Sequence, residues 1–140
     1  MIRFDNEFKL EPDMFKQVVF LKRRSGLTFE EFKDYYENQH SKLHKKVGDG
    51  KPFMPTAQRY VRRYITPEKN PVTGEVIDTG YDCIMEIWWN SRKDFEDSMA
   101  HLRDPAILPA LMADEKQVFA THSNPVMSVE EYDSPVGPNS

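Results

Sequence analysis

The chain has 140 residues, a length typical of a single domain, and its 39% hydrophobic and 12% aromatic residues suffice for a packed core. This composition excludes a disordered chain. The 19 Lys and Arg residues against 23 Asp and Glu residues leave a formal charge of -4, so we expect no nucleic-acid partner.

Cysteine content and hydropathy narrow the class further. Cys83 is the one cysteine, which excludes an intrachain disulfide and a cysteine-based metal site within one chain. The N-terminal sequence lacks the apolar core of a signal peptide, and no stretch approaches the roughly 20 apolar residues that span a bilayer. We therefore expect a cytoplasmic protein with no membrane partner.

The sequence pattern predicts one domain with two short extensions. Residues 1–13 are mixed and charged and are expected to form an N-terminal arm, residues 14–132 the domain, and residues 133–140 a flexible tail. Within 15–24, a β-prone apolar run bounded by charges predicts the first strand.

The first helix has the clearest local signal. Thr28 and Glu31 are spaced as a capping box, and Leu27 and Phe32 occupy the positions of a hydrophobic staple. Apolar residues then recur at helical spacing, which predicts a helix from Phe29 to about Lys46.

Two strands and two loops are predicted next. Residues 48–55 have loop composition, and residues 56–65 alternate as in a strand. Pro and Gly punctuate a long connection at 66–80, in which Thr73–Gly74 is a candidate hairpin turn. Residues 81–89 are rich in Ile, Tyr and Trp and predict the third strand.

Two helical stretches and a last strand complete the chain. Ser91 with Asp94 predicts the start of a helix that Asp104–Pro105 ends, a further helical stretch runs from Ala106 to about Phe119, and residues 122–132 predict a strand. The order βαββαβ predicts an α+β, ferredoxin-like fold, with a four-stranded antiparallel sheet and helices on one face.

This architecture leaves one face of the sheet bare. Tyr81 and Trp89 lie on one alternating set of the third strand and Trp88 on the other, so each face carries aromatic surface. A second copy packed sheet to sheet would cover the bare face, and we therefore expect a homodimer.

Several segments in this order resemble the EthD-domain family over most of residues 15–120. They are FKQVVFLKRRSGLTFEEFKDYYENQHSKL, AQRYVRRYI, YDCIMEIWWNSRKDF and ALMADEKQVF. The resemblance implies a dimeric α+β barrel with a cavity in each subunit. The sequence departs from shorter members in the N-terminal arm and the loops at 48–55 and 66–80, which we expect to cover the cavity mouth.

His40 is the leading catalytic candidate. It lies in a polar gap between Tyr36 and Leu43 on the apolar face of the first helix, and the resemblance implies that it points into the cavity. An imidazole there can take up or donate a proton near neutral pH. The alternative is a histidine at a helix end that bonds a carbonyl or a neighbouring loop.

Aromatic and basic residues on one face of the second strand are candidate ligand contacts. Tyr60, Arg62 and Tyr64 could orient a polar aromatic substrate or stabilise an enolate, with Tyr64 as a catalytic candidate and Tyr36 as a further binding candidate. The alternative is an amphipathic strand whose tyrosines pack and whose arginine pairs with a carboxylate.

The third strand carries further candidates on one face. Asp82 and Trp88 are candidates for substrate binding and Glu86 for catalysis. A buried mid-strand carboxylate needs a partner, so Glu86 is either paired with an arginine such as Arg62 or held with a raised pKa. The structural pairing is the favoured interpretation.

The remaining histidines carry weaker signals, and we expect no metal ion and no cofactor. His44 follows His40 at a spacing that can bind metal but has no carboxylate motif beside it. His101 could ligate haem in relatives of this fold but is better explained as a helix-end residue. His122 has no evident partner.

The residues and the resemblance together leave three functions open. The favoured one is a small cofactor-independent enzyme of the lyase or dehydratase, isomerase or cyclase type, acting by proton transfer on a small apolar oxygenated aromatic, lactone or polyketide-like molecule. The second is a cofactor-free or haem-dependent monooxygenase. The third is a non-catalytic, ligand-binding dimer associated with an oxygenase system.

Overall fold

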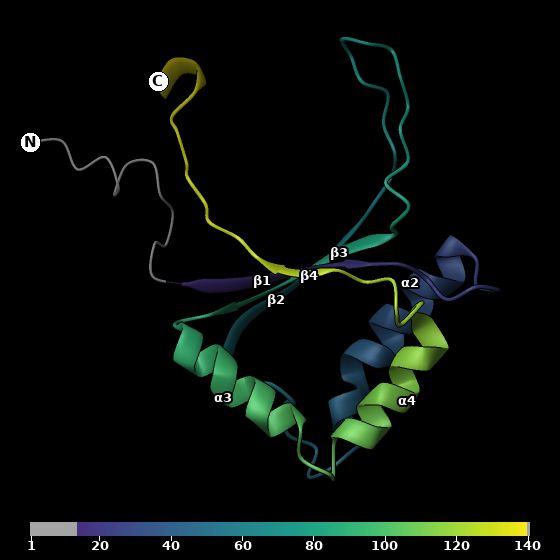
Figure 1. Cartoon of the computed structure of the whole chain (residues 1–140), viewed down its shortest axis with the longest axis vertical. Coiled ribbons are helices and arrows are strands. Elements are labelled where there is room, and N and C mark those ends of the chain that lie inside the picture. Colours follow the sequence, from purple (N-terminus) through teal and green to yellow (C-terminus); the bar gives the residue numbers. More distant parts are fainter. Residues whose placement is uncertain (1–13, 140) are drawn as a thin grey trace, which may run out of the picture.

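A computed structural model describes residues 14–139, and the predicted N-terminal arm at 1–13 lies outside them. The strands form one antiparallel sheet in the order β2-β3-β1-β4, and the α-helices lie together on one side of it (Figure 1), which confirms the α+β, ferredoxin-like fold. The elements are β1 (Phe15–Leu21), α2 (Phe29–Asn38), the 3-10 helix η1 (His40–Lys45), β2 (Ala57–Tyr64), β3 (Cys83–Trp89), α3 (Arg92–Leu102), α4 (Leu108–Val118), β4 (Val126–Ser128) and the 3-10 helix η2 (Gly137–Asn139).

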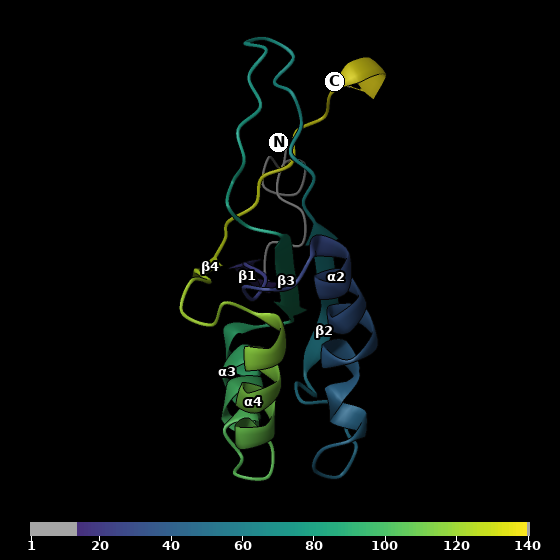
Figure 2. The same ribbon diagram turned by 90° about the vertical axis from the view of Figure 1, so that its right-hand side faces the viewer.

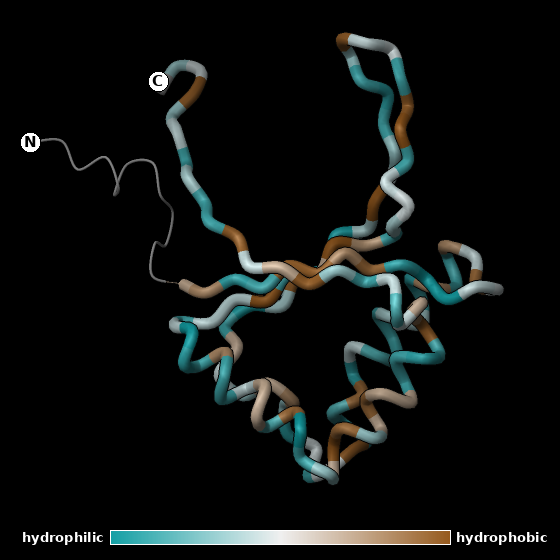
Figure 3. The backbone as a smooth tube through the Cα atoms, viewed as in Figure 1, coloured by the Kyte–Doolittle hydropathy of each residue, from teal (hydrophilic) through white to brown (hydrophobic). Residues whose placement is uncertain are grey.

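The register of β1 on β3 gives the sheet two distinct faces. Val19 pairs with Met85 and Leu21 with Cys83 on the inner face, which packs against the helices. Lys16 pairs with Trp88 on the outer face. Figure 3 shows apolar residues along the centre of the sheet and on parts of the helices. The core therefore lies between the inner face and the helices.

Helix α2 begins as the sequence predicts. The Thr28 hydroxyl accepts from the Glu31 backbone N–H, and the Glu31 carboxylate accepts from the Thr28 N–H, so both halves of the capping box form. Phe32 and Tyr36 follow on the buried face, at 0% and 1% exposure. Leu27 packs against the same core.

The end of this helix differs from the prediction. The α-helix stops at Asn38 instead of reaching Lys46, and the chain continues as η1. The Ser41 hydroxyl donates to the Glu37 carbonyl at 2.7 Å, which gives that carbonyl a side-chain partner four residues later. Such local side-chain bonds compete with the helical ladder, and they place the break just ahead of His40.

Hydrogen bonds fix helix α3 at its N-terminus and, through Ser98, against the sheet. Ser91 caps it by accepting from the Asp94 N–H, as predicted. Ser98 is fully buried and accepts from the Trp89 indole N–H at 2.9 Å, and the Thr56 hydroxyl lies 2.6 Å from the same Ser98 oxygen. The buried indole therefore has a partner for its one polar group.

Two segments project from the outer side of the sheet, away from the helices (Figures 1 and 2). The first is the connection 66–80, where backbone bonds between Asn70 and Glu75 and between Gly74 and Asn70 close the predicted hairpin turn. The second begins after Ser128, because pairing with β1 ends at Gln17 and β4 covers only three residues of the expected 122–132. In residues 14–139, no helix has the length and apolar content to cross a membrane.

Removing the capping hydroxyl should measurably destabilise the fold. Thr28→Ala is expected to lower the free energy of unfolding by about 1 kcal/mol, because it leaves a helix N-terminal donor without its acceptor. Urea denaturation of the variant and of Ser134→Ala, which changes an exposed position, provides the comparison. Equal stability of the two variants would contradict this role of Thr28.

Candidate functional site

A cavity of about 570 Å³ lies between the inner face of the sheet and the helices. Side chains from all four strands, from η1 and from helices α2, α3 and α4 line it, and the loop before β2 contributes Pro52, Phe53 and Met54. Residues 52–54 of the loop at 48–55 therefore form part of the cavity wall, and the expected role of the loop as a cover of the cavity mouth stays a prediction. The lining is chiefly apolar, with the amides of Gln17, Gln58 and Asn124 among its polar groups.

His40 lines this cavity and is held by a carboxylate. Its Nδ1 lies 2.7 Å from Asp114 Oδ2, and the Tyr35 hydroxyl donates to Asp114 Oδ1 at 2.5 Å. Burial, and then the bond to Asp114, raise the pKa of Tyr35 to about 12, so this phenol stays a donor. The rings of Tyr36 and Phe119 meet the imidazole edge to face, with centroids 5.6 Å and 5.1 Å away.

The bond to Asp114 decides which nitrogen of the His40 ring carries hydrogen. A carboxylate only accepts, so Nδ1 carries the hydrogen in this pair and Nε2 of the neutral ring keeps its lone pair. Asp114 was not predicted from the sequence, because it lies 74 residues from His40 and a helix pattern does not reveal which partner an acidic residue will meet.

Tyr36 and Tyr60 form a second polar group in the cavity. Their hydroxyl oxygens are 2.6 Å apart, and both residues line the cavity. Burial raises the pKa of Tyr36 well above its usual value and that of Tyr60 to about 12. Both phenols therefore stay protonated at neutral pH. Because one hydrogen serves the bond between them, the other is left for a ligand.

Tyr64 and Arg62 meet a different partner. Arg62 binds Glu37 through two nitrogens, with Nε–Oε2 at 2.9 Å and Nη2–Oε1 at 2.5 Å, and the Tyr64 hydroxyl donates to the same carboxylate at 2.6 Å. The bonds from Arg62 lower the pKa of Glu37. This network lies outside the cavity lining, so the ligand roles expected of Tyr64 and Arg62 stay predictions without support from the cavity.

Glu86 and Trp88 lie on the outer face of the sheet. Glu86 pairs with Arg63 at 2.5 Å and accepts from the Trp88 indole at 2.8 Å. The pairing with Arg62 offered from the sequence is wrong, because strand alternation puts Arg62 beside helix α2 and Arg63 on the same face as Glu86. Lys16 Nζ lies 3.6 Å from the Trp88 ring centroid. Neither Glu86 nor Trp88 lines the cavity, and their expected roles stay predictions.

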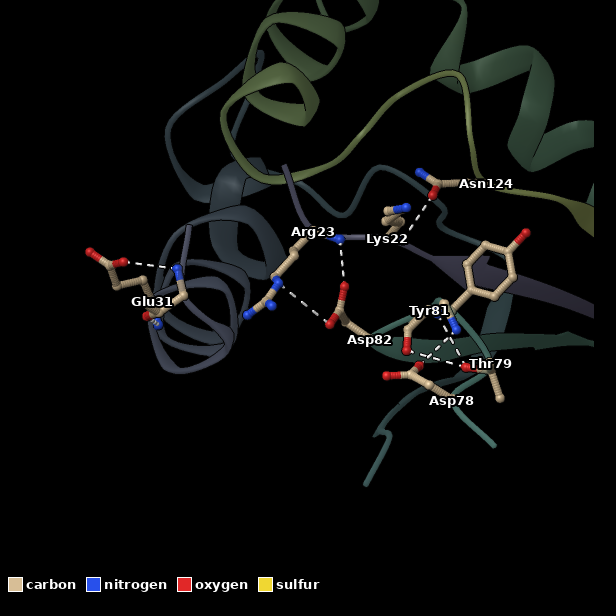
Figure 4. Close-up of polar contacts among 10 residues, drawn as sticks. Lys22, Arg23, Glu31, Asp78, Thr79, Tyr81, Asp82 and Asn124 are labelled. Atoms are coloured by element: carbon tan, nitrogen blue, oxygen red, sulfur yellow. Dashed lines mark hydrogen bonds and ion pairs between the residues drawn. The ribbon is translucent and has the colours of Figure 1, made fainter. Parts of the chain in front are cut away.

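Asp82 lies at the end of the sheet next to the basic turn after β1. Its Oδ2 accepts from the Arg23 backbone N–H at 2.8 Å, and the Arg23 side chain lies 3.7 Å from Oδ1 (Figure 4). Part of the connection 66–80 reaches this same region, including Thr66, Asp78 and Gly80, and not the cavity. The expectation that this loop covers the cavity is therefore wrong for the described chain, because the loop leaves on the outer side of the sheet.

Glu115 is a cavity residue that sequence reasoning missed. Leu111, Glu115 and Phe119 follow one another at four-residue spacing, and all three line the cavity. Burial raises the pKa of Glu115, and the charge of His40 opposes that shift. An acidic residue within an apolar helical stripe was the signal that could have identified it.

The other three histidines differ in whether they line the cavity. His44 lines the cavity beside the Phe53 ring, at a centroid distance of 6.2 Å, whereas His101 and His122 lie outside the lining. Between residues 14 and 139, no group of three or more His, Cys, Asp or Glu side chains is arranged to hold a metal ion.

The pattern of segments and the fold agree with a known family. The family model of the EthD domain matches residues 24–123, which include His40, Tyr60, Asp114 and Glu115. The chain belongs to the EthD family. A search of curated proteins gave no match.

The solved structures found to be similar to this EthD-family protein have low sequence identity to it. One is an EthD-family protein from Bacillus halodurans, with a TM-score of 0.53 and 17% identity over 84% of this chain and 98% of that one. Another is a dimeric protein of unknown function with a ferredoxin-like fold from Bacteroides fragilis, with a TM-score of 0.47 and 13% identity over 87% and 98% of the two chains. A third, with a TM-score of 0.48 and 13% identity over 91% and 99%, is a hydroxynitrile lyase from Passiflora edulis.

The bond to Asp114 should set the tautomer of His40. In ¹⁵N NMR spectra of the neutral ring, His40 is expected to carry its hydrogen on Nδ1, and Asp114→Ala should abolish this preference because the acceptor is gone. His44 serves as the internal control, since its ring signals should not change. Identical His40 signals in the two proteins would show that the carboxylate does not set the tautomer.

Proposed function

We propose that this EthD-family protein is a small cofactor-independent enzyme that transfers protons on an apolar, oxygenated ring compound, in a reaction of the lyase, isomerase or cyclase type. The observation that carries the proposal is the His40–Asp114 pair on the wall of the cavity. A partly buried carboxylate on one ring nitrogen leaves the other nitrogen free to act as a base on a bound molecule.

Asp114 and His40 have complementary tasks in this mechanism. Nε2 of His40 takes a proton from carbon next to a carbonyl, and the carboxylate of Asp114 stabilises the imidazolium that forms. Tyr35 holds Asp114 in place through its other oxygen, at 2.5 Å, and is therefore a positioning residue. Return of the proton to another carbon gives isomerisation, and its transfer from the imidazolium to a departing β-hydroxyl gives elimination of water.

The Tyr36–Tyr60 pair stabilises the negative charge that develops on the substrate oxygen. Tyr36 and Tyr60 have one phenolic hydrogen beyond their mutual bond, and the Arg62 guanidinium lies 4.6 Å from the Tyr60 ring centroid. A donor directed at a developing enolate oxygen lowers the barrier because it binds the charged state more strongly than the ketone. The substrate oxygen is thus expected to bind at Tyr36 or Tyr60.

The size and lining of the cavity support a small neutral substrate. A volume of about 570 Å³ falls within the range of roughly 300–1,000 Å³ common for small-molecule sites. Apolar side chains predominate, and amides can bond ring substituents without requiring charge. The lining includes Val19, Leu21, Ile87, Leu111 and Phe119.

Hydrogen–deuterium exchange tests the base without knowledge of the natural substrate. Acetophenone in D₂O should exchange its methyl protons faster with the protein present, and His40→Gln should reduce the catalysed rate by about 10²-fold because the base is lost. Asp114→Asn should cost about tenfold, as expected for a weakened charge-assisted bond. Proton NMR measures the exchange.

His101→Gln is the matched control, because this histidine lies outside the cavity lining. It should exchange at the wild-type rate. Exchange by wild type no faster than by His40→Gln would contradict the proposed function.

We also propose that a second copy of the chain covers the outer face of the sheet. The two projecting segments, 66–80 and 129–139, stand on that side and expose apolar side chains, with Val76 at 62% and Tyr132 at 69% exposure. Large apolar side chains on extended segments with few contacts of their own are typical of surfaces that meet a partner. The partner is therefore a protein surface, and a symmetric copy supplies one.

The charges of segment 66–80 and of the strands also support a second copy of the chain as the partner. Segment 66–80 carries Glu68, Glu75 and Asp78 against one lysine, Lys69. The strands bear exposed cations at the outer face, where the Arg59 guanidinium lies over the Trp88 ring and Arg63 pairs with Glu86. An acidic projection of one copy would therefore lie near the basic strands of the other.

Acidic substitutions on the projection should weaken the dimer. The double variant Val76→Glu, Ile77→Glu is expected to raise the dimer dissociation constant at least tenfold, because charges would enter an apolar contact. Sedimentation velocity over a concentration series measures this. Met112→Glu, an exposed change on the helix side, should sediment as wild type. A wild-type protein that remains monomeric at every concentration would overturn the dimer proposal.

A further inference from the structure

The register of the sheet places three cavity residues in one row across its inner face. Gln17 of β1 pairs with Ile87 of β3, and on its other side Ile87 pairs with Tyr60 of β2. Residues paired in this way point to the same face of a sheet, and all three line the cavity. Two strand spacings, roughly 10 Å, separate the backbones of Gln17 and Tyr60.

Gln17 is a polar residue in an apolar part of this face. Val19 and Leu21 occupy the next inner positions of β1, are 6% and 4% exposed, and line the cavity beside it. Strand β1 lies inside the sheet, between β3 and β4. The Gln17 side chain is nevertheless only half-buried, because the cavity lies over it. Its amide is therefore open to a ligand.

The hydrogen-bonding groups of the Gln17 amide are uncommitted. Within residues 14–139, the side chain forms no hydrogen bond. The other two amides in the described lining are engaged: Gln58 donates to the Thr56 carbonyl at 3.1 Å, and Asn124 accepts from the Lys22 backbone N–H at 2.8 Å. A primary amide offers two donor hydrogens and an acceptor oxygen, so Gln17 can bond either a hydroxyl or a carbonyl.

The Tyr36–Tyr60 pair stands at the other end of the same row. The two hydroxyl oxygens are 2.6 Å apart, and one phenolic hydrogen remains for a ligand. Ile87, at 2% exposure, lies between this pair and Gln17 and forms an apolar floor. A planar ring packed on Ile87 meets a phenol at one edge and an amide at the opposite edge. Such a ring satisfies both when it carries polar substituents at opposite positions.

We propose that Gln17 is a specificity-determining residue of the cavity: its amide hydrogen-bonds an oxygen substituent that lies across the substrate ring from the group bound at Tyr36 and Tyr60. The substrates are accordingly ring ketones with a second oxygen at the opposite position, such as para-hydroxyaryl ketones. The inference deepens the proposed function and rests on it in taking this cavity as the substrate site. A ligand with a methyl group at that position leaves the amide without a partner and binds more weakly.

Two ligands of the same shape test this selection. The compounds para-hydroxyacetophenone and para-methylacetophenone differ in whether the para group forms hydrogen bonds, and NMR or calorimetric titration gives their dissociation constants. Wild type should bind the hydroxyl compound about fivefold or more tightly than the methyl compound. Gln17→Met keeps the length of the side chain without its amide. It should reduce this preference about tenfold, as expected for loss of one hydrogen bond of about 1.4 kcal/mol.

Two controls separate hydrogen bonding from a general loss of packing. The ortho isomer of hydroxyacetophenone carries its hydroxyl beside the carbonyl, where it cannot reach Gln17 while the carbonyl is bound at the tyrosine pair. Gln17→Met should therefore leave its affinity unchanged. Gln117→Met changes an exposed glutamine of α4 outside the cavity lining, and it should bind both para compounds as wild type does.

Each remaining outcome has a definite meaning. The same preference in wild type and Gln17→Met, an equal loss of affinity for the ortho isomer, or no binding of either para compound by wild type would overturn the inference. A preference that depends on Gln17, without catalysed hydrogen–deuterium exchange, would contradict the proposed function and support the inference. Exchange that depends on His40, together with binding that does not depend on Gln17, would overturn only the inference.

Discussion

The packing of Phe32, Tyr36 and Phe119 against the sheet is the constraint on which the rest of the structure depends. Their rings meet edge to face with centroids 5.2–6.0 Å apart, and Phe32 and Tyr36 are almost fully buried. Burying each such side chain contributes roughly 1.5–3 kcal/mol. This cluster holds α2 against the end of α4, and it thereby brings a histidine from one helical segment to a carboxylate on the other.

The same packing explains why the polar groups of the interior are divided into separate sets. His40 is hydrogen-bonded to Asp114, and the phenols of Tyr36 and Tyr60 are hydrogen-bonded to each other. The Glu37 carboxylate accepts hydrogen bonds from Arg62 and Tyr64. Among the described residues, no buried side-chain nitrogen or oxygen lacks a hydrogen-bond partner. Polar groups that satisfy one another can remain beside an apolar cavity without the large cost of burying them alone.

Local and periodic signals in the sequence were sufficient for the fold. The capping box at Thr28 and the alternation of β3 depend on neighbours a few residues apart, and both are confirmed. The end of α2 could not be predicted, because the Ser41 hydroxyl competes with the backbone for one carbonyl and periodicity does not register such a bond.

The candidate site could be predicted from the sequence only in part, because it depends on pairings between distant segments. Inward-facing positions such as His40, Tyr36 and Tyr60 could be selected from strand and helix periodicity. Their partners could not: Arg62 and Arg63 are neighbours in sequence, and only the sheet register shows which of them meets Glu86. Asp114 likewise acquires its importance from the meeting of α4 with η1.

The break between α2 and η1 ties His40 to one wall of the cavity through the chain itself. His40 begins the 3-10 segment, and the same stretch of chain continues to Pro52, Phe53 and Met54 on the cavity wall. The imidazole and this wall therefore belong to one continuous segment, which joins α2 through Gln39. The bond from His40 to Asp114 anchors the start of this segment to α4, so a change in the length or packing of the loop would also act on the position of the imidazole.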